Sequence, residues 1–226
     1  MKPKISIIIP VGNLLRDFSN LQEYLKIVEL REVQLIIVID DPAPNALTLG
    51  FLKKFNENHL NLRIVHSSYG NPGGARNIGI DSSDSDWITF WDSDDSVDLS
   101  VFKSVIDNVK LESNYMYASS LMLFSKKEKI LEISSSNRFL KSHFIRNPGI
   151  WRCIIPSAIA RDISFPQSKM GEDQVFLSFV LGKVSDIKFI NYGYYFHQND
   201  SYGSLTNVKS SFSELEISIK EIEKIF

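Results

Sequence analysis

The sequence has one cysteine, Cys153, and no long uninterrupted run of apolar residues. A single cysteine cannot close an internal disulfide, so a disulfide-stabilised secreted scaffold is excluded and a reducing compartment is favoured. The apolar stretch near the N-terminus, residues 5–11, is interrupted by Ser6 and Pro10. It is too short for a transmembrane helix and makes a poor signal peptide. These absences predict a soluble, cytoplasmic protein.

An excess of charge of either sign is also missing. The 25 Lys and Arg residues against 27 Asp and Glu residues give a formal net charge of −2 and a sequence pI near 6.1. Such a balance provides no general attraction to nucleic acid or to acidic membranes, so we expect no nucleic-acid partner. With 43% hydrophobic residues among 226, the chain can bury a sizeable core and fits one large domain, or one domain with a small elaboration.

Apolar runs and helical patterns alternate through the first half of the chain. Runs rich in β-branched and aromatic residues predict buried strands over 5–10, 35–39, 62–66 and 87–91. Apolar residues at helical spacing predict helices over 14–28, 47–55 and 99–109. We therefore expect an α/β fold in which helices flank a mostly parallel sheet.

The second half is less regular and predicts a smaller region of mixed strands. A helix is expected from Gly171 to about Leu181, and the pattern over 139–145 is ambiguous. The expected strands are 115–124 and 130–134, which would pair antiparallel, followed by 154–160 and 187–196.

No repeat, low-complexity tract or linker divides the chain. We predict one domain over residues 1–205, made of the halves 1–110 and 111–205, followed by an amphipathic helix over 206–226. The apolar residues of that helix keep coiled-coil spacing for only two heptads, short of the three or four that a coiled coil requires. We expect it to pack on the domain. Alternatively it contacts a partner or a second copy in a homo-oligomer, or the chain is a fragment of something longer.

Polar residues follow three of the predicted strands. Residues 10–13 follow the first strand, Asp40 and Asp41 the second, and residues 92–95 the fourth. In open α/β sheets ligands bind at the carboxyl ends of the strands, so these groups should meet at one edge. A second acidic cluster, 84–86, precedes its strand and should lie at the opposite edge as a solvated turn.

Three carboxylates are crowded into the stretch that follows the fourth strand: Asp92, Asp94 and Asp95. They repel one another and call for a compensating cation. Asp92 and Asp94 point the same way in extended geometry, roughly 6–7 Å apart at Cβ, and can share one hard cation that keeps sites for phosphate oxygens and water. Helix capping explains one acidic residue but not three. A calcium loop is excluded because Val97 replaces its Gly and Lys103 its Glu.

A second costly feature lies upstream. The turn signal 71–74 opens a helix, and Arg76 stands near its start, where the helix dipole disfavours a cation. A phosphate group beside Arg76 and a divalent metal beside the aspartates would relieve both costs. The two features together indicate the chemistry of a metal-bound nucleotide diphosphate.

These elements resemble the family 2 glycosyltransferases, which have the GT-A fold. Five elements of the family are matched in order. Its strand ending in Pro is matched by 6–10, and its strand ending in Asp-Asp by 37–41. Its Ala-Arg-Asn-X-Gly segment is matched by 70–79, its Asp-Ser-Asp-Asp loop by 90–95, and the element with its catalytic carboxylate by 171–176. The order and spacing extend over residues 4 to about 205. The resemblance implies a GT-A, Rossmann-like sheet with a smaller acceptor-side region.

The resemblance also implies roles for individual residues. Asp40 matches the residue that contacts the nucleotide base, and Arg76 the group that faces the ribose or diphosphate. Asp92 and Asp94 match the Asp-X-Asp motif, with Asp94 the more direct metal ligand. Asp173 matches the base that deprotonates the acceptor hydroxyl. The remaining residues implied to contact the nucleotide-sugar are Pro10, Asn13, Gly74 and Ser93.

Three further residues have two interpretations each. His197 follows the last predicted strand and either contacts the metal or a phosphate, or is a solvated strand-end histidine. Trp151 is either an acceptor-side residue or part of the core. Glu172 either assists the metal or the acceptor, or simply favours a helix N-terminus, worth about 0.3–1 kcal/mol.

The implied reaction is the inverting transfer of a sugar from a nucleotide-diphosphate sugar, with UDP the favoured nucleotide and Mn²⁺ or Mg²⁺ as cofactor. The implied acceptor is a saccharide or lipid-linked saccharide, as in cell-surface polysaccharide synthesis at the inner face of the membrane. Two departures lie near the base pocket. Gly12 stands where many relatives have an aromatic residue, and Pro42-Ala43-Pro44 where they favour Gly-Ser.

Other functions are less consistent with the sequence. A nucleotidyltransferase normally needs a basic, Gly-rich loop after the first strand, and residues 11–14 provide neither feature. A dinucleotide-binding oxidoreductase is disfavoured because no G-x-G-x-x-G follows a strand. A catalytically inactive nucleotide-sugar-binding module is disfavoured by the intact Asp92, Asp94 and Asp173, and turnover would decide it.

Overall fold

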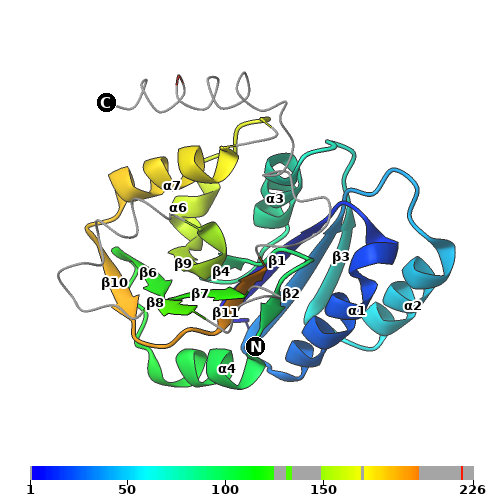
Figure 1. Ribbon diagram of the computed structural model, residues 1–226, viewed down its shortest axis with the longest axis horizontal. Coiled ribbons are helices and arrows are strands. Elements are labelled where there is room, and N and C mark those ends of the chain that lie inside the picture. The colour runs from blue at the N-terminus through cyan, green and yellow to red at the C-terminus, as the bar shows by residue number, and fades with distance from the viewer. Residues whose placement is uncertain (1, 125–130, 134–148, 169–170, 199–219, 221–226) are drawn as a thin grey trace.

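The computed structural model describes residues 2–124, 131–133, 149–168, 171–198 and 220. A large sheet of seven strands, in the order β10-β6-β9-β4-β1-β2-β3, forms its centre (Figure 1). Its parallel N-terminal part consists of β3 (Leu62–His66), β2 (Val33–Ile39), β1 (Ile5–Val11) and β4 (Trp87–Phe90). The predicted alternation of the first half is confirmed.

The remaining strands of the large sheet come from the second half of the chain. Strand β9 (Cys153–Pro156) lies antiparallel between β4 and β6 (Tyr115–Ser119), and β10 (Asp186–Ile190) pairs parallel with β6 at the edge. The sheet is therefore mixed but mostly parallel, as expected of an α/β fold.

Helices cover both faces of the large sheet (Figure 1). One core cluster joins alternate β1 residues to α1 (Leu14–Leu25), the short η1 (Lys26–Glu29), α2 (Ala46–Glu57) and α4 (Leu99–Asn108). The other cluster joins the opposite face to α3 (Pro72–Asp81), α6 (Ser157–Arg161) and α7 (Glu172–Lys183). Strand β1 is buried along its whole length because side chains of both faces enter a core.

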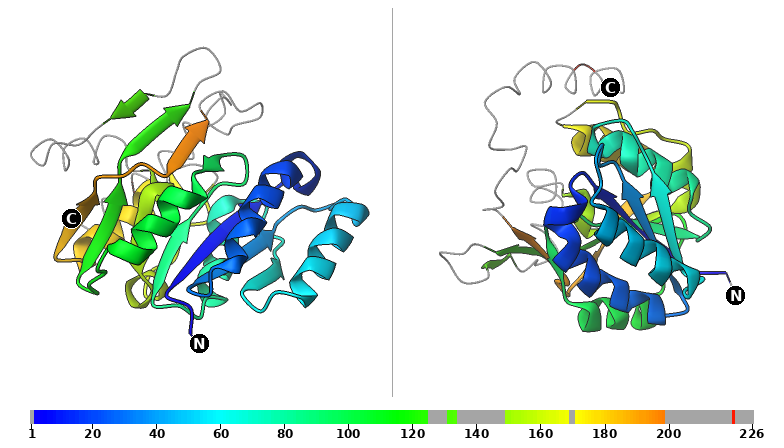
Figure 2. Two further views of the ribbon diagram at one scale, coloured as in Figure 1. Left: turned by 90° about the horizontal axis from the view of Figure 1, so that it is seen from below. Right: turned by 90° about the vertical axis from the view of Figure 1, so that its right-hand side faces the viewer.

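A second, four-stranded sheet stands out from the body of the large one (Figure 2). Its order is β5 (Ser96–Val97), β11 (Tyr195–Gln198), β7 (Leu121–Phe124) and β8 (Leu131–Ile133). The predicted antiparallel pairing is confirmed for β7 and β8, and β11 pairs antiparallel with β5 but parallel with β7. The predicted smaller region of mixed strands is thus confirmed in part, because β7, β8 and β11 form this sheet whereas β6, β9 and β10 extend the large one.

Three predicted strands of the second half have wrong limits. The strand predicted over 115–124 is broken at Ser120 into β6 and β7, which belong to different sheets. The one predicted over 154–160 ends at Pro156, because its partner β4 begins opposite that residue, and α6 follows. The one predicted over 187–196 is two strands, because β10 ends where β6 ends and residues 191–194 lead into the other sheet.

The predicted helix after Gly171 is confirmed as α7, although it ends slightly later. The ambiguous segment 139–145 lies outside the described residues, as does the terminal helix 206–226 except for Lys220, which is helical. In the part of the chain described here, no helix combines the length and the apolar character needed to cross a membrane. The short η2 (Ile150–Arg152) precedes β9.

Candidate active site

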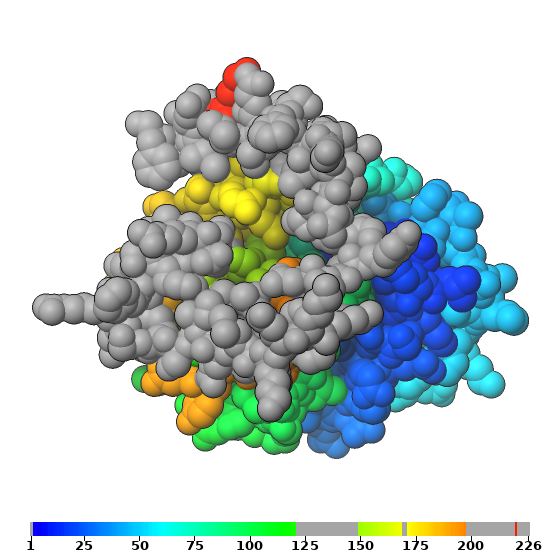
Figure 3. Space-filling view, in the orientation of Figure 1, coloured from blue at the N-terminus to red at the C-terminus, as the bar shows by residue number. Residues whose placement is uncertain are grey.

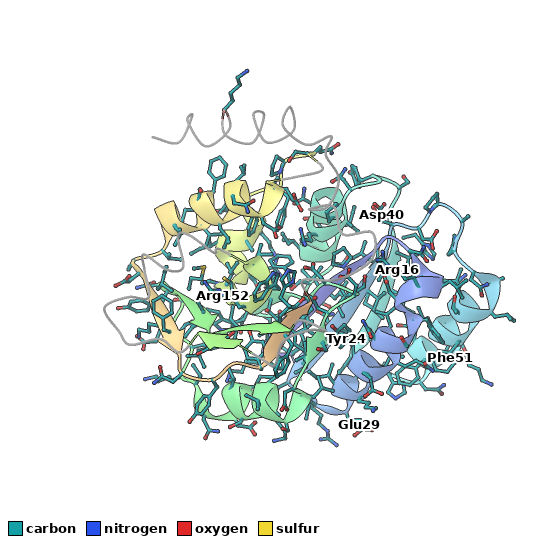
Figure 4. All side chains as sticks on the ribbon, in the orientation of Figure 1. Arg16, Tyr24, Glu29, Asp40, Phe51 and Arg152 are labelled. Atoms are coloured by element: carbon teal, nitrogen blue, oxygen red, sulfur yellow. The ribbon has the colours of Figure 1, made fainter. Side chains whose placement is uncertain are left out.

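The carboxyl ends of the first three strands meet at one edge of the large sheet. The Asp40 N–H donates to Val11 O at 2.9 Å, and the Ser67 N–H donates to Ile39 O at 2.9 Å. Figure 4 places Asp40 and Arg16 at this same end. Strand β4 pairs parallel with β1, so its carboxyl end lies at this edge too, and the predicted convergence of the polar strand ends is confirmed.

The loops after β1 and β2 are fixed by side-chain caps. Asn13 is the N-cap of α1, and its side chain accepts from Arg16 N at 3.0 Å. Asp41 accepts from Leu14 N at 2.8 Å with one carboxylate oxygen and from Ala43 N at 2.9 Å with the other. Both loops are thereby held in place beside Asp40.

Asp40 itself is nearly buried, and its Oδ1 accepts from Tyr69 N at 2.9 Å. Pro10, the strand-end proline, is buried within β1 opposite Val38 of β2. The nucleotide contacts predicted for Pro10, Asn13 and Asp40 stay predictions, and the structure brings the three residues to one edge.

The acidic cluster 84–86 lies at the opposite edge, as predicted. Asp84 forms an ion pair with Arg63 at 2.7 Å, and Asp86 pairs with Lys2. All four side chains are well exposed. The position of these carboxylates at the amino ends of the strands separates them from the site.

Arg76 occupies α3 and is almost completely buried, with 4% of its side chain exposed. Its Nη2 donates to Asp92 Oδ1 at 2.9 Å, and its Nη1 donates to Asp173 Oδ1 at 2.8 Å and Glu172 Oε1 at 3.1 Å. The negative charge that makes this cation acceptable is thus supplied by three carboxylates of the chain itself. A contact between Arg76 and a nucleotide stays a prediction.

Local backbone geometry brings these groups together. Asn71 caps α3 by accepting from Gly74 N at 2.7 Å, which places Arg76 in the second turn. At the start of α7, Gly171 has φ +78, a left-handed conformation that glycine adopts without strain. Glu172 and Asp173 follow in the first turn of α7 and face the guanidinium.

The electrostatic surroundings tune two of the carboxylates. Burial raises the pKa of Asp173 to about 7, with Glu172 and Asp92 adding to the rise and Arg76 opposing it. Burial also raises the pKa of Asp92, against the lowering effect of Arg76. A carboxyl group that titrates near neutral pH is suited to accept a proton as a general base.

The third acidic residue of the loop, Asp95, faces the protein interior and is 1% exposed. Its Oδ2 accepts from Tyr195 Oη at 2.6 Å and lies 3.0 Å from His197 Nδ1. Tyr24 Oη donates to the Asp95 main-chain oxygen at 2.7 Å, and Asp92 N donates to Tyr195 Oη at 2.9 Å. Asp95 therefore anchors the loop, and the crowding of the carboxylates is relieved by groups of α1 and β11.

Ser93 is anchored in the same way from α1. Its Oγ donates to Asp17 Oδ2 at 2.6 Å, and Asn20 Nδ2 donates to its main-chain oxygen at 3.2 Å. Asp17 is buried and also pairs with Arg16 at 2.5 Å. The Ser93 side chain is thus occupied inside the protein, and its predicted contact with the nucleotide-sugar stays a prediction.

Asp94 is the carboxylate of the loop that stays available. Among the described residues it enters no ion pair and accepts no hydrogen bond from another side chain. Burial and the neighbouring Asp92 raise its pKa, while Arg16 opposes the rise. A cation beside Asp94 would be electrostatically favoured.

The predicted metal set is only partly arranged for a metal. His197 turns Nδ1 toward Asp95, and its pKa is raised because the interactions with Asp95, Asp92 and Asp94 outweigh burial. In the described ranges, no group of three or more His, Cys, Asp or Glu residues is placed to hold a metal ion. Asp92 and Asp94 suit a hard divalent cation only if phosphate and water oxygens complete its shell, which is how Mg²⁺ is commonly held.

Trp151 lies in the core, 8% exposed, beneath the aromatic side chains of β11. Its ring is nearly parallel to those of Tyr195, at 4.9 Å and 14°, and His197, at 5.1 Å and 11°. The core interpretation describes what the side chain does, and an additional acceptor-side role for it or for Glu172 stays a prediction.

Residues 6–162 match the family described as Glycosyl transferase family 2, and the chain therefore belongs to this family. It is 28% identical over 103 residues to the uncharacterized glycosyltransferase YibD of Escherichia coli K12, covering 46% of this chain and 29% of that protein. It is 37% identical over 62 residues to the succinoglycan biosynthesis protein ExoW of Rhizobium meliloti, covering 26% and 19%. The chain thus aligns with less than a third of the length of these relatives.

Solved structures of TarS from Staphylococcus aureus share the fold. TarS is a poly(ribitol-phosphate) β-N-acetylglucosaminyltransferase. The TarS 1–349 complex with UDP-GlcNAc superposes with a TM-score of 0.76 at 20% identity, covering 96% of this chain and 66% of that one. The complex with UDP gives 0.73 at 22% identity, covering 97% and 64%. The likeness confirms the GT-A fold expected from the sequence.

Proposed function

We propose that this chain is a glycosyltransferase that moves a sugar from a nucleotide-diphosphate donor, with UDP as the nucleotide, to a hydroxyl of a saccharide or lipid-linked saccharide. The observation that carries the proposal is the buried Arg76, which holds Asp92 and Asp173 to one guanidinium at the ligand-binding edge of the sheet. The UDP-GlcNAc complex of TarS and the polysaccharide role in the name of ExoW support the donor and the pathway class.

In the proposed reaction, Asp173 is the general base. The acceptor oxygen forms a bond to the anomeric carbon while its proton passes to the Asp173 carboxylate. The bond from the anomeric carbon to the diphosphate breaks, and its electron pair leaves with the nucleoside diphosphate. Attack from the face opposite the leaving group inverts the anomeric centre. Arg76 fixes the orientation of the carboxylate for this proton transfer.

Asp92 and Asp94 are the proposed holders of Mn²⁺ or Mg²⁺. When bound, such a cation would supply charge neutralisation for the diphosphate leaving group. Asp94 has the available carboxylate, and Asp92 offers the oxygen that Arg76 does not contact. We further propose that the enzyme is located in the cytoplasm, where the reducing environment keeps the buried Cys153 as a free thiol.

The donor and metal claims are tested by calorimetry with UDP in Mn²⁺ and in EDTA. We expect tighter binding with Mn²⁺, and Asp94→Ala should abolish the difference. Asp86→Ala is the matched control, because Asp86 belongs to the acidic cluster at the opposite edge. Equal affinity with and without metal would contradict metal dependence. Absence of both nucleoside diphosphate binding and diphosphate release from nucleotide-sugars would overturn the proposed function.

A further inference from the structure

At the edge of the sheet beside Asp40, the residue that follows β1 has no side chain that could cover an apolar ligand. Gly12 directly follows β1, is exposed, and a Cβ there would meet no atom within 4 Å. A nucleobase presents two flat apolar faces, and leaving both in water would forfeit the burial that drives binding of aromatic rings. If a nucleotide binds at this edge, a side chain from another segment must cover its base.

Tyr69 is the side chain placed to do so. It follows β3, and its backbone N–H donates to Asp40 Oδ1 at 2.9 Å, so the residue is tied directly to the strand end. Its main-chain oxygen accepts from Asn71 Nδ2 at 3.2 Å, and Gly70 has φ +66, which bends the chain sharply after it. Tyr69 is therefore held at both its backbone polar groups.

The ring of Tyr69 has one covered side and remains accessible elsewhere. A Cβ added at Gly74 would lie 2.5 Å from Tyr69 Cγ and 3.0 Å from Cδ2, so the ring packs directly on the backbone at the start of α3. Even so, 48% of Tyr69 is exposed. A large aromatic ring that is held on one side and open to solvent is a preformed stacking surface.

The other exposed aromatic residues described here do not have this arrangement. Phe51 is 43% exposed but contacts the rings of Phe18 at 5.4 Å and Phe55 at 6.1 Å, between α1 and α2. These two helices form the blue side of the molecule in Figure 3. Tyr192 is 60% exposed but follows β10, the edge strand at the far end of the sheet from β3.

We propose that Tyr69 is the stacking surface for the nucleobase of the donor, and that it determines how strongly a nucleoside diphosphate binds relative to its diphosphate alone. The inference rests on the proposed function, because it assumes a nucleotide at this edge. Stacking uses the π-face that every base has. Tyr69 therefore contributes affinity for the base as such, while discrimination between bases comes from polar groups at their edges.

The test compares UDP with inorganic pyrophosphate, which has no base, by calorimetry in Mn²⁺. Tyr69→Ala should bind UDP about 5- to 150-fold more weakly than the wild type, because it loses the base–aromatic stack. Pyrophosphate binding should change less than twofold. Tyr69→Phe should bind UDP like the wild type, because the ring is kept. Tyr69→Leu fills the space over Gly74 without a π-face, so it should fold normally and still bind UDP weakly.

The outcomes separate the two claims. Tyr192→Ala is the control for loss of an exposed tyrosine and should leave both affinities unchanged. If the wild type binds UDP and Tyr69→Leu binds it equally well, the stacking inference is overturned and the proposed function stands. Equal weakening of UDP and pyrophosphate would show that Tyr69 acts on the loop and not on the base. If the wild type binds pyrophosphate but no nucleoside diphosphate, both claims fail.

Discussion

At the scale of single residues, Arg76 determines the charge balance of the site. Arg76 is buried, and its guanidinium donates to Asp92 at 2.9 Å, to Asp173 at 2.8 Å and to Glu172 at 3.1 Å, so the first two contacts have the length of charge-assisted hydrogen bonds. Removal of this cation would leave three carboxylates crowded together without a compensating charge.

We therefore expect Arg76→Gln to lower the free energy of unfolding by about 3–5 kcal/mol, as for other buried ion pairs that lose one partner. Urea unfolding measures the loss. Arg63→Gln is the control, because Arg63 forms a single exposed ion pair with Asp84, worth less than about 1 kcal/mol. If both variants lose equally little, Arg76 is not a structural cation, and its role would be limited to ligand contact.

The raised pKa of Asp173 should give the proposed reaction a pH dependence. The carboxylate accepts a proton only when ionised, so the rate should rise with pH through about 7 and level off above it. Asp173→Asn should reduce transfer roughly 10²–10⁴-fold while UDP affinity survives. The pH–rate profile and steady-state kinetics measure both. Asp162→Asn, an exposed partner of Lys183, should leave the rate unchanged. If Asp173→Asn turns over at nearly the wild-type rate, Asp173 is not the general base, and Glu172 is the next residue to test.

The raised pKa of Asp173 also makes the stability of the fold depend on pH. The rate should rise with pH, whereas this contribution to stability should fall. The folded state raises the pKa of Asp173 above its usual value, so folding favours the protonated form. Stability that Asp173 contributes at low pH is lost as the pH rises from about 4 to 7. The Asn variant keeps an oxygen for Arg76 without the charge. It should melt no lower than the wild type at pH 8, which differential scanning calorimetry can check.

At the scale of elements, β11 holds the acidic loop in place although it is distant in sequence. Tyr195 Oη connects Asp92 N to Asp95 Oδ2, and burial raises the pKa of Tyr195 well above its ordinary value, so the phenol stays a donor. The strand also pairs with β5, immediately after the loop. The position of the loop is thus fixed by main-chain and side-chain contacts together.

Tyr195→Phe should cost about 1–3 kcal/mol of stability and also weaken binding of UDP in Mn²⁺, because the loop loses its common anchor. Tyr117→Phe is a matched control. Its hydroxyl likewise connects two groups, accepting from Glu112 N at 2.8 Å and donating to Lys110 O at 3.0 Å, outside the site. We expect similar destabilisation but unchanged UDP affinity. Equal affinities for the two variants would contradict the anchoring role of Tyr195.

The elements of the first half were predictable because continuous apolar runs mark buried parallel strands. The limits of β6, β9 and β10 were not, because each ends opposite the first or last residue of a partner strand from another part of the chain. The same distinction applies to the site. Residues at strand ends were predictable from position, whereas Asp17, Tyr24 and Tyr195 meet the acidic loop across 76, 71 and 100 residues, which no local pattern reveals.

At the scale of the whole molecule, the two predicted halves share one core. The cluster on the face of α1 and α4 includes Tyr117, Trp151, Ile154, Ile190 and Tyr195 from the second half. Strand β4, which leads into the acidic loop, pairs with β9 on one side and β1 on the other. We therefore expect the halves 1–110 and 111–205 to fold together as one unit.

A fragment of residues 1–110 should accordingly lack a cooperative thermal transition, because it exposes the β4 edge and one side of the core. It should also fail to bind UDP, since it lacks Tyr195, whose hydroxyl contacts both Asp92 N and Asp95 Oδ2. Circular dichroism and calorimetry measure the two properties. A fragment that melts cooperatively and binds UDP would contradict a shared core and support an independent nucleotide-binding half.

The contact of Arg76 with Glu172 and Asp173 also limits how the gene can be recombined. The partners are separated by 96 and 97 residues, so a crossover between related genes anywhere in that interval inherits the cation from one parent and the acids from the other. Such a chimera keeps the ion pairs around Arg76 only if both parents encode the same arrangement. The site is therefore inherited intact only when the codon for Arg76 and the codons for Glu172 and Asp173 are inherited together.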